Sequence, residues 1–126
     1  MENPRIQPAQ LGKQQASTER NDPNPTLYDV LYMFEDRFKH IEPLIESFLP
    51  EANRFERLRD EAKNLVRDYQ DPAKRPPLLG ALVGVKDIFH VDGFETRAGT
   101  QVPSQLFAGK EAVVVTKLKQ AGALIA

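Results

Sequence analysis

The sequence contains no cysteine, and it has no long uninterrupted hydrophobic run. The absence of cysteine excludes a disulfide framework, a thiol nucleophile and a cysteine-based metal site. No apolar stretch approaches the roughly 18 residues that a membrane-spanning helix needs. The N-terminus also lacks the apolar core of a signal peptide. We therefore expect no membrane partner and a cytoplasmic location.

An excess of charge of one sign is also missing. The chain carries 17 basic and 18 acidic side chains, which gives a formal net charge of −1. Such a balanced surface lacks the basic patch that nucleic acid or an anionic membrane would bind, so we expect no nucleic-acid partner. What is present is ordinary for a globular protein: 126 residues, 40% hydrophobic and 28% charged, enough for one small domain.

The first 25 residues are polar and contain four prolines. A segment of this composition buries too little apolar surface to offset the entropy of ordering it, so we expect residues 1–25 to form a disordered tail. Ordered structure is expected over residues 26–126.

Two helices are expected in the first half of the ordered part. Apolar residues recur at helical spacing over residues 27–41, with Thr26 and Asp29 as a plausible N-terminal cap and with Pro43 as the latest end of the helix. A second helix is expected over about residues 53–69. It has one apolar face, and we interpret its opposite face, which carries charges of alternating sign, as solvated.

The second half predicts a strand, a helix and a second strand. Residues 78–91, which read LLGALVGVKDIFHV, suit a strand that is buried on both faces. A glycine-rich loop leads to a third helix at about residues 111–120, with Gly122 just past its end, and residues 123–126 begin another buried strand. This order predicts a parallel βαβ unit and an α/β fold class. An apolar sheet edge would remain open, so we expect the fold to be truncated.

Lys86 stands inside the apolar run, where burying an ammonium group without partners is costly. Two outcomes are open. In the first, burial favours the neutral amine, which is a usable base. In the second, the lysine pairs with Asp87 or reaches water from a strand end. A phosphate-binding loop is excluded, because the spacing G-x3-G-x-K and the residue that follows do not fit one. His40 and His90 lack ligand partners at the spacing of a metal site, so we expect both histidines to have structural roles. We expect no metal and no cofactor.

Residues 77–100, PLLGALVGVKDIFHVDGFETRAGT, resemble the first conserved block of the amidase signature family. Members typically read P-L-x-G-I-P-V-x-V-K-D-x-x-x-V-x-G-x-x-T-x-x-G followed by Ser or Thr. Residues 111–126 look like the helix and strand that follow in that family, although Glu111 replaces the usual Asp. The resemblance covers residues 26–126. It implies N-terminal helices plus the first strand–helix–strand of the family's mixed sheet.

The resemblance further implies hydrolysis of carbon–nitrogen (amide) bonds by a Ser–cis-Ser–Lys mechanism. Lys86 would be the catalytic base, acting through a bridging serine on the nucleophilic serine. In the family both serines lie in a glycine- and serine-rich block, and Ser17, Ser47 and Ser104 do not match it. Asp87 follows the lysine in the family as well, and we expect it to support the local backbone.

Two functional hypotheses follow. The first is an N-terminal fragment of an amidase that acts on a small-molecule amide and is inactive alone. Since the family includes amidotransferase subunits together with general amidases and fatty-acid amide hydrolases, amidotransferase-type subunit partners belong to this hypothesis. The second is a small non-catalytic α/β module that binds a partner through its open sheet edge. Cooperative folding of the isolated chain favours the module, whereas aggregation favours truncation.

Overall fold

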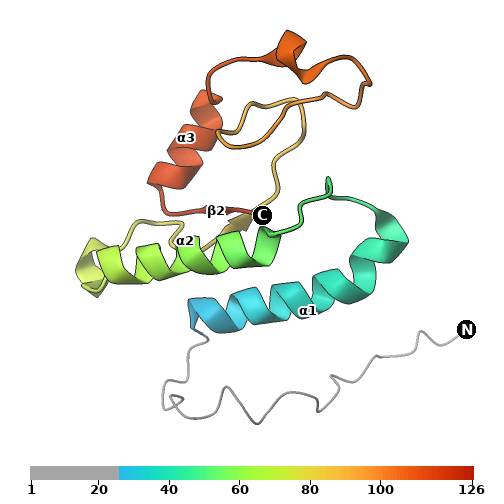
Figure 1. Ribbon diagram of the computed structural model, residues 1–126. Coiled ribbons are helices and arrows are strands. Elements are labelled where there is room, and N and C mark those ends of the chain that lie inside the picture. Colours follow the sequence, from blue (N-terminus) through green and yellow to red (C-terminus); the bar gives the residue numbers. More distant parts are fainter. Residues whose placement is uncertain (1–25) are drawn as a thin grey trace, which may run out of the picture.

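The computed structural model describes residues 26–126, so the predicted disordered tail lies outside the described residues. Two long helices come first, and a parallel strand–helix–strand unit follows them (Figure 1). This arrangement confirms the predicted α/β class. The elements are α1 (Leu27–Ile45), α2 (Arg54–Asp68), the 3-10 turn η1 (Pro72–Lys74), β1 (Leu82–Val83), the 3-10 turn η2 (Ser104–Phe107), α3 (Val113–Gln120) and β2 (Leu124–Ile125).

The start of α1 confirms the prediction, but its end does not. Thr26 Oγ1 accepts the backbone N–H of Asp29 at 3.2 Å, and the Asp29 carboxylate accepts the N–H of Thr26 at 3.0 Å, which is a capping box. The helix continues two residues past Pro43, so the predicted end was wrong. A proline in the last turn removes one hydrogen bond only. The helix then ends at Glu46, whose left-handed backbone directs its N–H to the Glu42 carbonyl at 2.8 Å.

The hairpin of α1 and α2 is closed by phenylalanine rings at the end where the two helices connect. Phe48, in the connection, packs 5.4 Å from the ring of Phe38 and 6.3 Å from that of Phe34, measured between centroids. Phe55 of α2 completes the cluster at 5.3 Å from Phe38. These tilted and edge-on contacts are the geometries that aromatic pairs prefer. They fix the connection, residues 46–53, against the hairpin.

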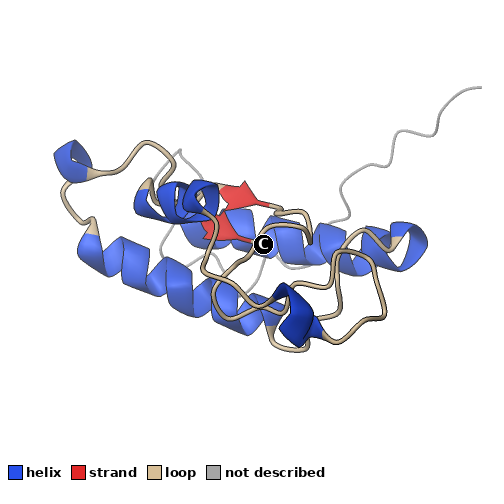
Figure 2. Ribbon diagram, turned by 90° about the horizontal axis from the view of Figure 1, so that it is seen from above, coloured by secondary structure: helices blue, strands red, loops and turns tan. Residues whose placement is uncertain are grey.

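The small sheet lies between α2 on one face and α3 on the other, as the two views show (Figures 1 and 2). Successive side chains of β2 point to opposite faces, as the pleat of a strand requires. Leu124 packs with Leu31 of α1 and with Leu58 of α2 in one apolar cluster. Ile125 packs with Val115 of α3 in a second cluster. The predicted apolar face of the second helix is therefore a core face.

The strands pair in parallel, which confirms the predicted βαβ unit. Leu82 lies opposite Leu124, and Val83 lies opposite Ile125. The predicted strand over residues 78–91 was too long, because β1 spans two residues only. In the part of the chain that the structure describes, β1 pairs with β2 alone. Because β2 pairs with it at these two positions only, β1 is no longer than two residues.

Gly122 ends α3, as the sequence predicts. Its φ is +91°, and its N–H donates to the Lys119 carbonyl at 2.9 Å. The N–H of Ala123 donates to the Leu118 carbonyl at 3.0 Å. These two bonds form a Schellman motif, which requires a left-handed residue at this position. The glycine thus turns the chain from α3 directly into β2.

Replacing Gly122 with alanine is expected to destabilise the fold for two reasons. A Cβ atom would lie 2.7 Å from Pro76 Cγ and 3.0 Å from Leu79 Cα, and the left-handed backbone would add strain. Together these effects should lower the free energy of unfolding by about 2–5 kcal/mol. Gly93→Ala is the matched control. Gly93 has the same φ of +91° with nothing within 4 Å of the added atom, so it should cost about 1–2 kcal/mol. Equal losses in urea unfolding curves would contradict the steric account.

Candidate functional site

Lys86 lies three residues past the end of β1, at the carboxyl-terminal edge of the sheet. Its carbonyl accepts the N–H groups of Ile88 and Phe89 at 2.7 and 3.1 Å, so the chain turns sharply after the lysine. The residue is exposed, so the structure shows the second of the two outcomes that the sequence left open. Lys86 reaches water from beyond a strand end. The carboxyl edge of parallel strands is nevertheless where open α/β sheets bind ligands.

Asp87 fixes the backbone around the lysine, as the sequence analysis expected. Its carboxylate accepts the N–H of Arg97 at 2.9 Å, and its carbonyl accepts the N–H of Ala98 at 2.9 Å. These bonds tie the loop over residues 95–100 to the turn that begins at Lys86. Ala98 adopts a left-handed backbone with a φ of 49°. Asp87 therefore has a structural role: it holds two loops beside the lysine.

Lys86 lines a groove of about 870 Å³ between the α1–α2 connection and the loops that follow β1. The end of β2, at Ile125 and Ala126, also lines it. Ser47 is the one serine among its lining residues. Its hydroxyl donates to the Glu42 carboxylate at 2.8 Å, which is a local bond at the end of α1. Ser104 lies in η2 and lines a different cavity with His90. The structure therefore gives neither serine a place in a catalytic arrangement with Lys86.

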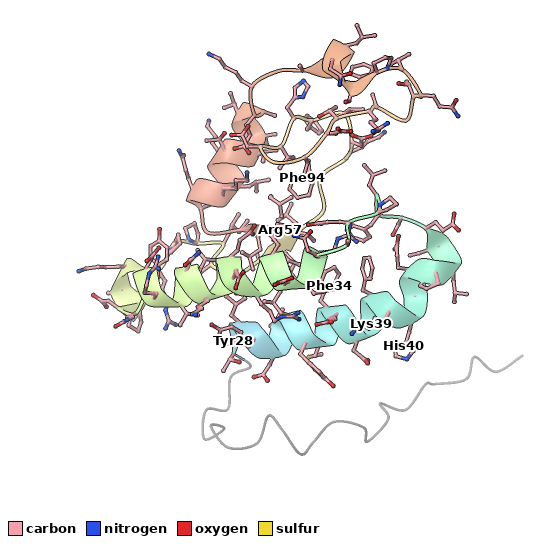
Figure 3. All side chains as sticks on the ribbon, in the orientation of Figure 1. Tyr28, Phe34, Lys39, His40, Arg57 and Phe94 are labelled. Atoms are coloured by element: carbon pink, nitrogen blue, oxygen red, sulfur yellow. The ribbon has the colours of Figure 1, made fainter. Side chains whose placement is uncertain are left out.

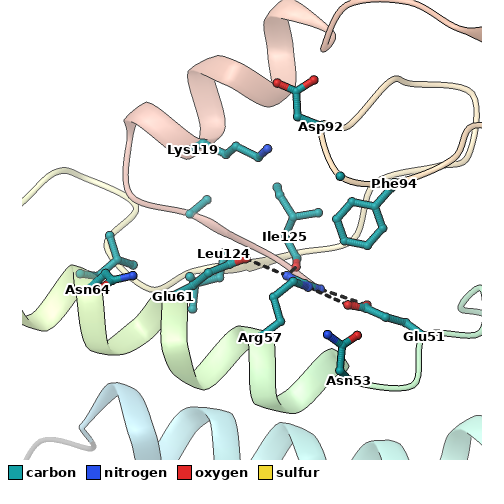
Figure 4. A pocket seen from close by; sticks show the side chains of 13 residues that line it. Glu51, Asn53, Arg57, Glu61, Asn64, Asp92, Phe94, Lys119, Leu124 and Ile125 are labelled. Atoms are coloured by element: carbon teal, nitrogen blue, oxygen red, sulfur yellow. Dashed lines mark hydrogen bonds and ion pairs between the residues drawn. The ribbon is translucent and has the colours of Figure 1, made fainter.

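Sequence reasoning missed a network of three charged side chains, in which Arg54 and Arg57 both bind Glu51. Figure 4 shows part of this network. Arg57 binds the Glu51 carboxylate with two bonds of 2.7 and 3.1 Å. Arg54 donates to the same carboxylate at 3.2 Å and to the Leu49 carbonyl at 2.6 Å. The side chains of Arg54, Glu51 and Arg57 are 7%, 14% and 19% exposed. The predicted solvated face of the second helix was therefore wrong for both arginines.

Arg57 also connects α2 to the sheet and to the loop after β1. Its Nη1 donates to the Ile125 carbonyl at 2.9 Å and to the Glu61 carboxylate at 3.1 Å. The ring of Phe94 lies over the guanidinium group, with its centroid 5.0 Å from Cζ. Figure 3 shows Phe94 reaching from its loop toward Arg57 on α2. One side chain thus joins α2 and the connection before it to two segments that are distant in sequence, β2 and the loop after β1.

The electrostatics of this network favour its charged form. The hydrogen bonds from Arg57 lower the pKa of Glu51 below its usual value, and this effect outweighs burial, which acts in the opposite direction. The same hydrogen bonds raise the pKa of Arg57. Both groups are therefore held ionised at neutral pH, and neither is suited to exchange a proton during a reaction.

The two histidines have local roles in the fold, as predicted. The Nδ1 atom of His90 lies 3.0 Å from the hydroxyl of buried Thr96, and that of His40 lies 2.7 Å from the Asp36 carbonyl. Across residues 26–126, no group of three or more histidine, aspartate and glutamate side chains could hold a metal ion. In the same part of the chain, no helix has both the length and the apolar character needed to cross a membrane.

Comparisons with known proteins agree with the motif around Lys86. The chain is 36% identical over 90 residues to a glutamyl-tRNA(Gln) amidotransferase subunit from Oleidesulfovibrio alaskensis, and the match covers 71% of this chain and 18% of that protein. It is 30% identical over 107 residues to fatty-acid amide hydrolase 2-A of Danio rerio, and this match covers 79% of this chain and 20% of that protein. The chain thus spans about one fifth of the length of these curated relatives. No solved structure matches it significantly. The family model described as Amidase matches residues 29–126, and the chain therefore belongs to the amidase family.

Proposed function

We propose that this chain is the N-terminal part of an enzyme that hydrolyses amide bonds, and that Lys86 is its catalytic base. The observation that carries the proposal is the position of Lys86. It lies in the motif over residues 77–100, at the carboxyl edge of the parallel strands, and it lines a groove large enough for a small molecule. One relative is named as a fatty-acid amide hydrolase and another as part of an amidotransferase, and both names describe chemistry at an amide bond.

The proposed reaction is a Ser–cis-Ser–Lys acyl transfer. The neutral amine of Lys86 accepts a proton from the bridging serine, which takes the proton of the nucleophilic serine. The nucleophile attacks the amide carbonyl, and the carbon–nitrogen bond breaks as Lys86 returns the proton through the bridging serine to the leaving amine. Water then hydrolyses the acyl-enzyme. In this proposal the serines come from a segment outside these 126 residues, and that segment also covers Lys86, because a lysine serves as a base only in its neutral form.

The substrate in this proposal is a small-molecule amide. An amidotransferase-type subunit partner belongs to the proposal only if the enzyme resembles the relative from Oleidesulfovibrio in its assembly as well as in its sequence. A cytoplasmic location stays a prediction.

The test compares the chain alone with a chimera. In the chimera, the aligned segment of the Danio rerio hydrolase is replaced by the matching segment of this chain. The 126-residue chain should release no ammonia from a panel of primary amides, because it lacks the nucleophile. The chimera should hydrolyse a fatty-acid amide. Turnover by the chain alone, or a folded chimera without activity, would contradict the proposal.

A further inference from the structure

A tight turn lies at residues 97–100, in the loop that follows β1. The backbone N–H and the hydroxyl of Thr100 both donate to the Arg97 carbonyl, each at 2.9 Å. Both central residues have a positive φ, 49° at Ala98 and 68° at Gly99. A hydrogen bond from the fourth residue to the first across two left-handed residues marks a type I′ β-turn.

Alanine is an unfavourable residue at the first central position of this turn. A left-handed backbone brings its Cβ atom close to a carbonyl oxygen, so the conformation persists only where surrounding bonds determine it. Asp87 supplies those bonds. Its carboxylate accepts the N–H of Arg97, and its carbonyl accepts the N–H of Ala98, both at 2.9 Å. One residue thus holds both ends of the peptide that enters the turn.

The same residue fixes the backbone that carries Lys86. The two carbonyl groups that follow the Cα atom of Lys86 are both bonded: that of Lys86 to the N–H groups of Ile88 and Phe89, and that of Asp87 to the turn at Ala98. The backbone sets the direction of the Cα–Cβ bond of Lys86, and with it the positions that the amine can reach. A general base must come within hydrogen-bond reach of the proton that it accepts.

We propose that Asp87 is a positioning residue for Lys86: its carboxylate oxygen, as a hydrogen-bond acceptor, clamps the turn at Ala98 to the backbone of the lysine. In this inference the acceptor oxygen matters and the negative charge does not. The inference rests on the proposed amidase function, because it concerns the reach of the Lys86 amine. It uses only bonds within residues 86–100, so it does not depend on which segment covers the lysine.

The first test uses the chimera with the Danio rerio hydrolase, in which this segment is part of a whole enzyme. Asp87→Ala removes the acceptor. It should lower kcat by about 10–100-fold with little change in KM, because a small misplacement of a catalytic group costs about this much. Asp68→Ala is the matched control, since this carboxylate is 52% exposed and does not line the Lys86 groove. It should keep its rate within about twofold.

Asp87→Asn separates the acceptor from the charge, because the amide oxygen still accepts a hydrogen bond. Its kcat should stay within about threefold of the parent chimera, since the bond loses only the part of its strength that the charge contributes. The pH profile of kcat should keep its position. A loss as large as that of Asp87→Ala, or a displaced pH profile, would assign the role to the charge and overturn the inference.

Ala98→Gly tests the turn itself. Glycine adopts a left-handed backbone without strain, and a pair of glycines is favoured at the centre of this turn, so the turn then needs less support. Added to the Asp87→Ala chimera, Ala98→Gly should restore kcat by at least about threefold, because the two changes act on one element and do not add. No gain in kcat would contradict the role of the turn.

The last comparison removes the base. In the Lys86→Ala chimera, Asp87→Ala should lower the residual rate by less than about twofold, because residues that act through one group are not additive. A further loss as large as that of Asp87→Ala alone would overturn the inference. Circular dichroism and thermal unfolding show whether each variant folds. Loss of folding with Asp87→Ala, both alone and together with Ala98→Gly, would mean that Asp87 supports the whole fold, and it would also overturn the inference.

The outcomes distinguish this inference from the proposed function. If the Lys86→Ala chimera keeps its activity, the catalytic proposal fails, and the inference fails with it. If Lys86 is essential but Asp87→Ala keeps the kcat of the parent chimera, the catalytic proposal stands and the inference alone fails.

Discussion

Replacing Lys86 with alanine in the active chimera is expected to lower kcat for amide hydrolysis by about 10²–10⁴-fold, the contribution that a positioned general base typically makes. KM should change little, because the proton transfer takes place in the transition state and not in the bound ground state. The measurement is a set of steady-state rates for one fatty-acid amide at several concentrations, on variants with matched circular dichroism spectra.

Two further variants make this result specific. Lys86→Arg keeps the positive charge but offers no neutral base, so its loss should resemble that of Lys86→Ala. Lys110→Ala changes another exposed lysine that does not line the groove. It should keep its rate within about twofold, as expected for a surface site away from the chemistry. A Lys86→Ala chimera that keeps most of its activity would show that another group is the base.

Replacing Glu51 with alanine is expected to lower the free energy of unfolding by about 3–5 kcal/mol, the usual cost of removing one partner from a buried ion pair. The change leaves Arg54 without its carboxylate, and the Arg54 side chain is only 7% exposed. It also removes the two bonds that fix Arg57, whose guanidinium group donates to the Ile125 carbonyl of β2. Urea unfolding of the chain, followed by the helical circular dichroism signal, measures the loss.

Glu61→Ala is the matched control for Glu51. Glu61 also pairs with Arg57, at 3.1 Å, but its side chain is 42% exposed. An exposed pair of this kind contributes about 0–1 kcal/mol, so the control should be close to wild type. Similar losses for the two variants would mean that burial does not set the strength of the network.

The same carboxylate makes stability depend on pH in a defined direction. Because the pKa of Glu51 is lower in the folded chain than in the unfolded chain, its contribution is fully present above the unfolded value of about 4.3. That contribution is lost as the pH falls from there through the lower folded pKa. Glu51→Gln should therefore flatten the acid side of the stability profile.

Local signals in the sequence were enough to predict the helices and their order. The Thr26 cap, the apolar stripe of the second helix and Gly122 each act through neighbours a few residues away, and the structure confirms all three. The parallel pairing of the two strands was predicted because a helix separates them. The motif around Lys86 was sufficient to recognise the family.

The features that were predicted wrongly depend on distant partners or on finer energetics. Arg54 and Arg57 of α2 were assigned to a solvated face, yet Arg57 binds the Ile125 carbonyl, 68 residues away in the sequence. Pro43 was expected to stop α1, but near a helix end its missing N–H removes only one bond. The strand predicted around Lys86 was too long, because strand pairing stops at Val83; the lysine lies beyond it and is exposed, which is one of the two outcomes that the sequence left open.

The most direct test of the central claim is chemical rescue of the Lys86→Ala chimera with added primary amines. If Lys86 acts as a base, small amines that enter the space left by its side chain should restore hydrolysis, and the restored rate should rise with both amine concentration and amine basicity. A variant that no amine rescues, or a rescue that does not depend on basicity, would contradict the assignment of Lys86 as the catalytic base.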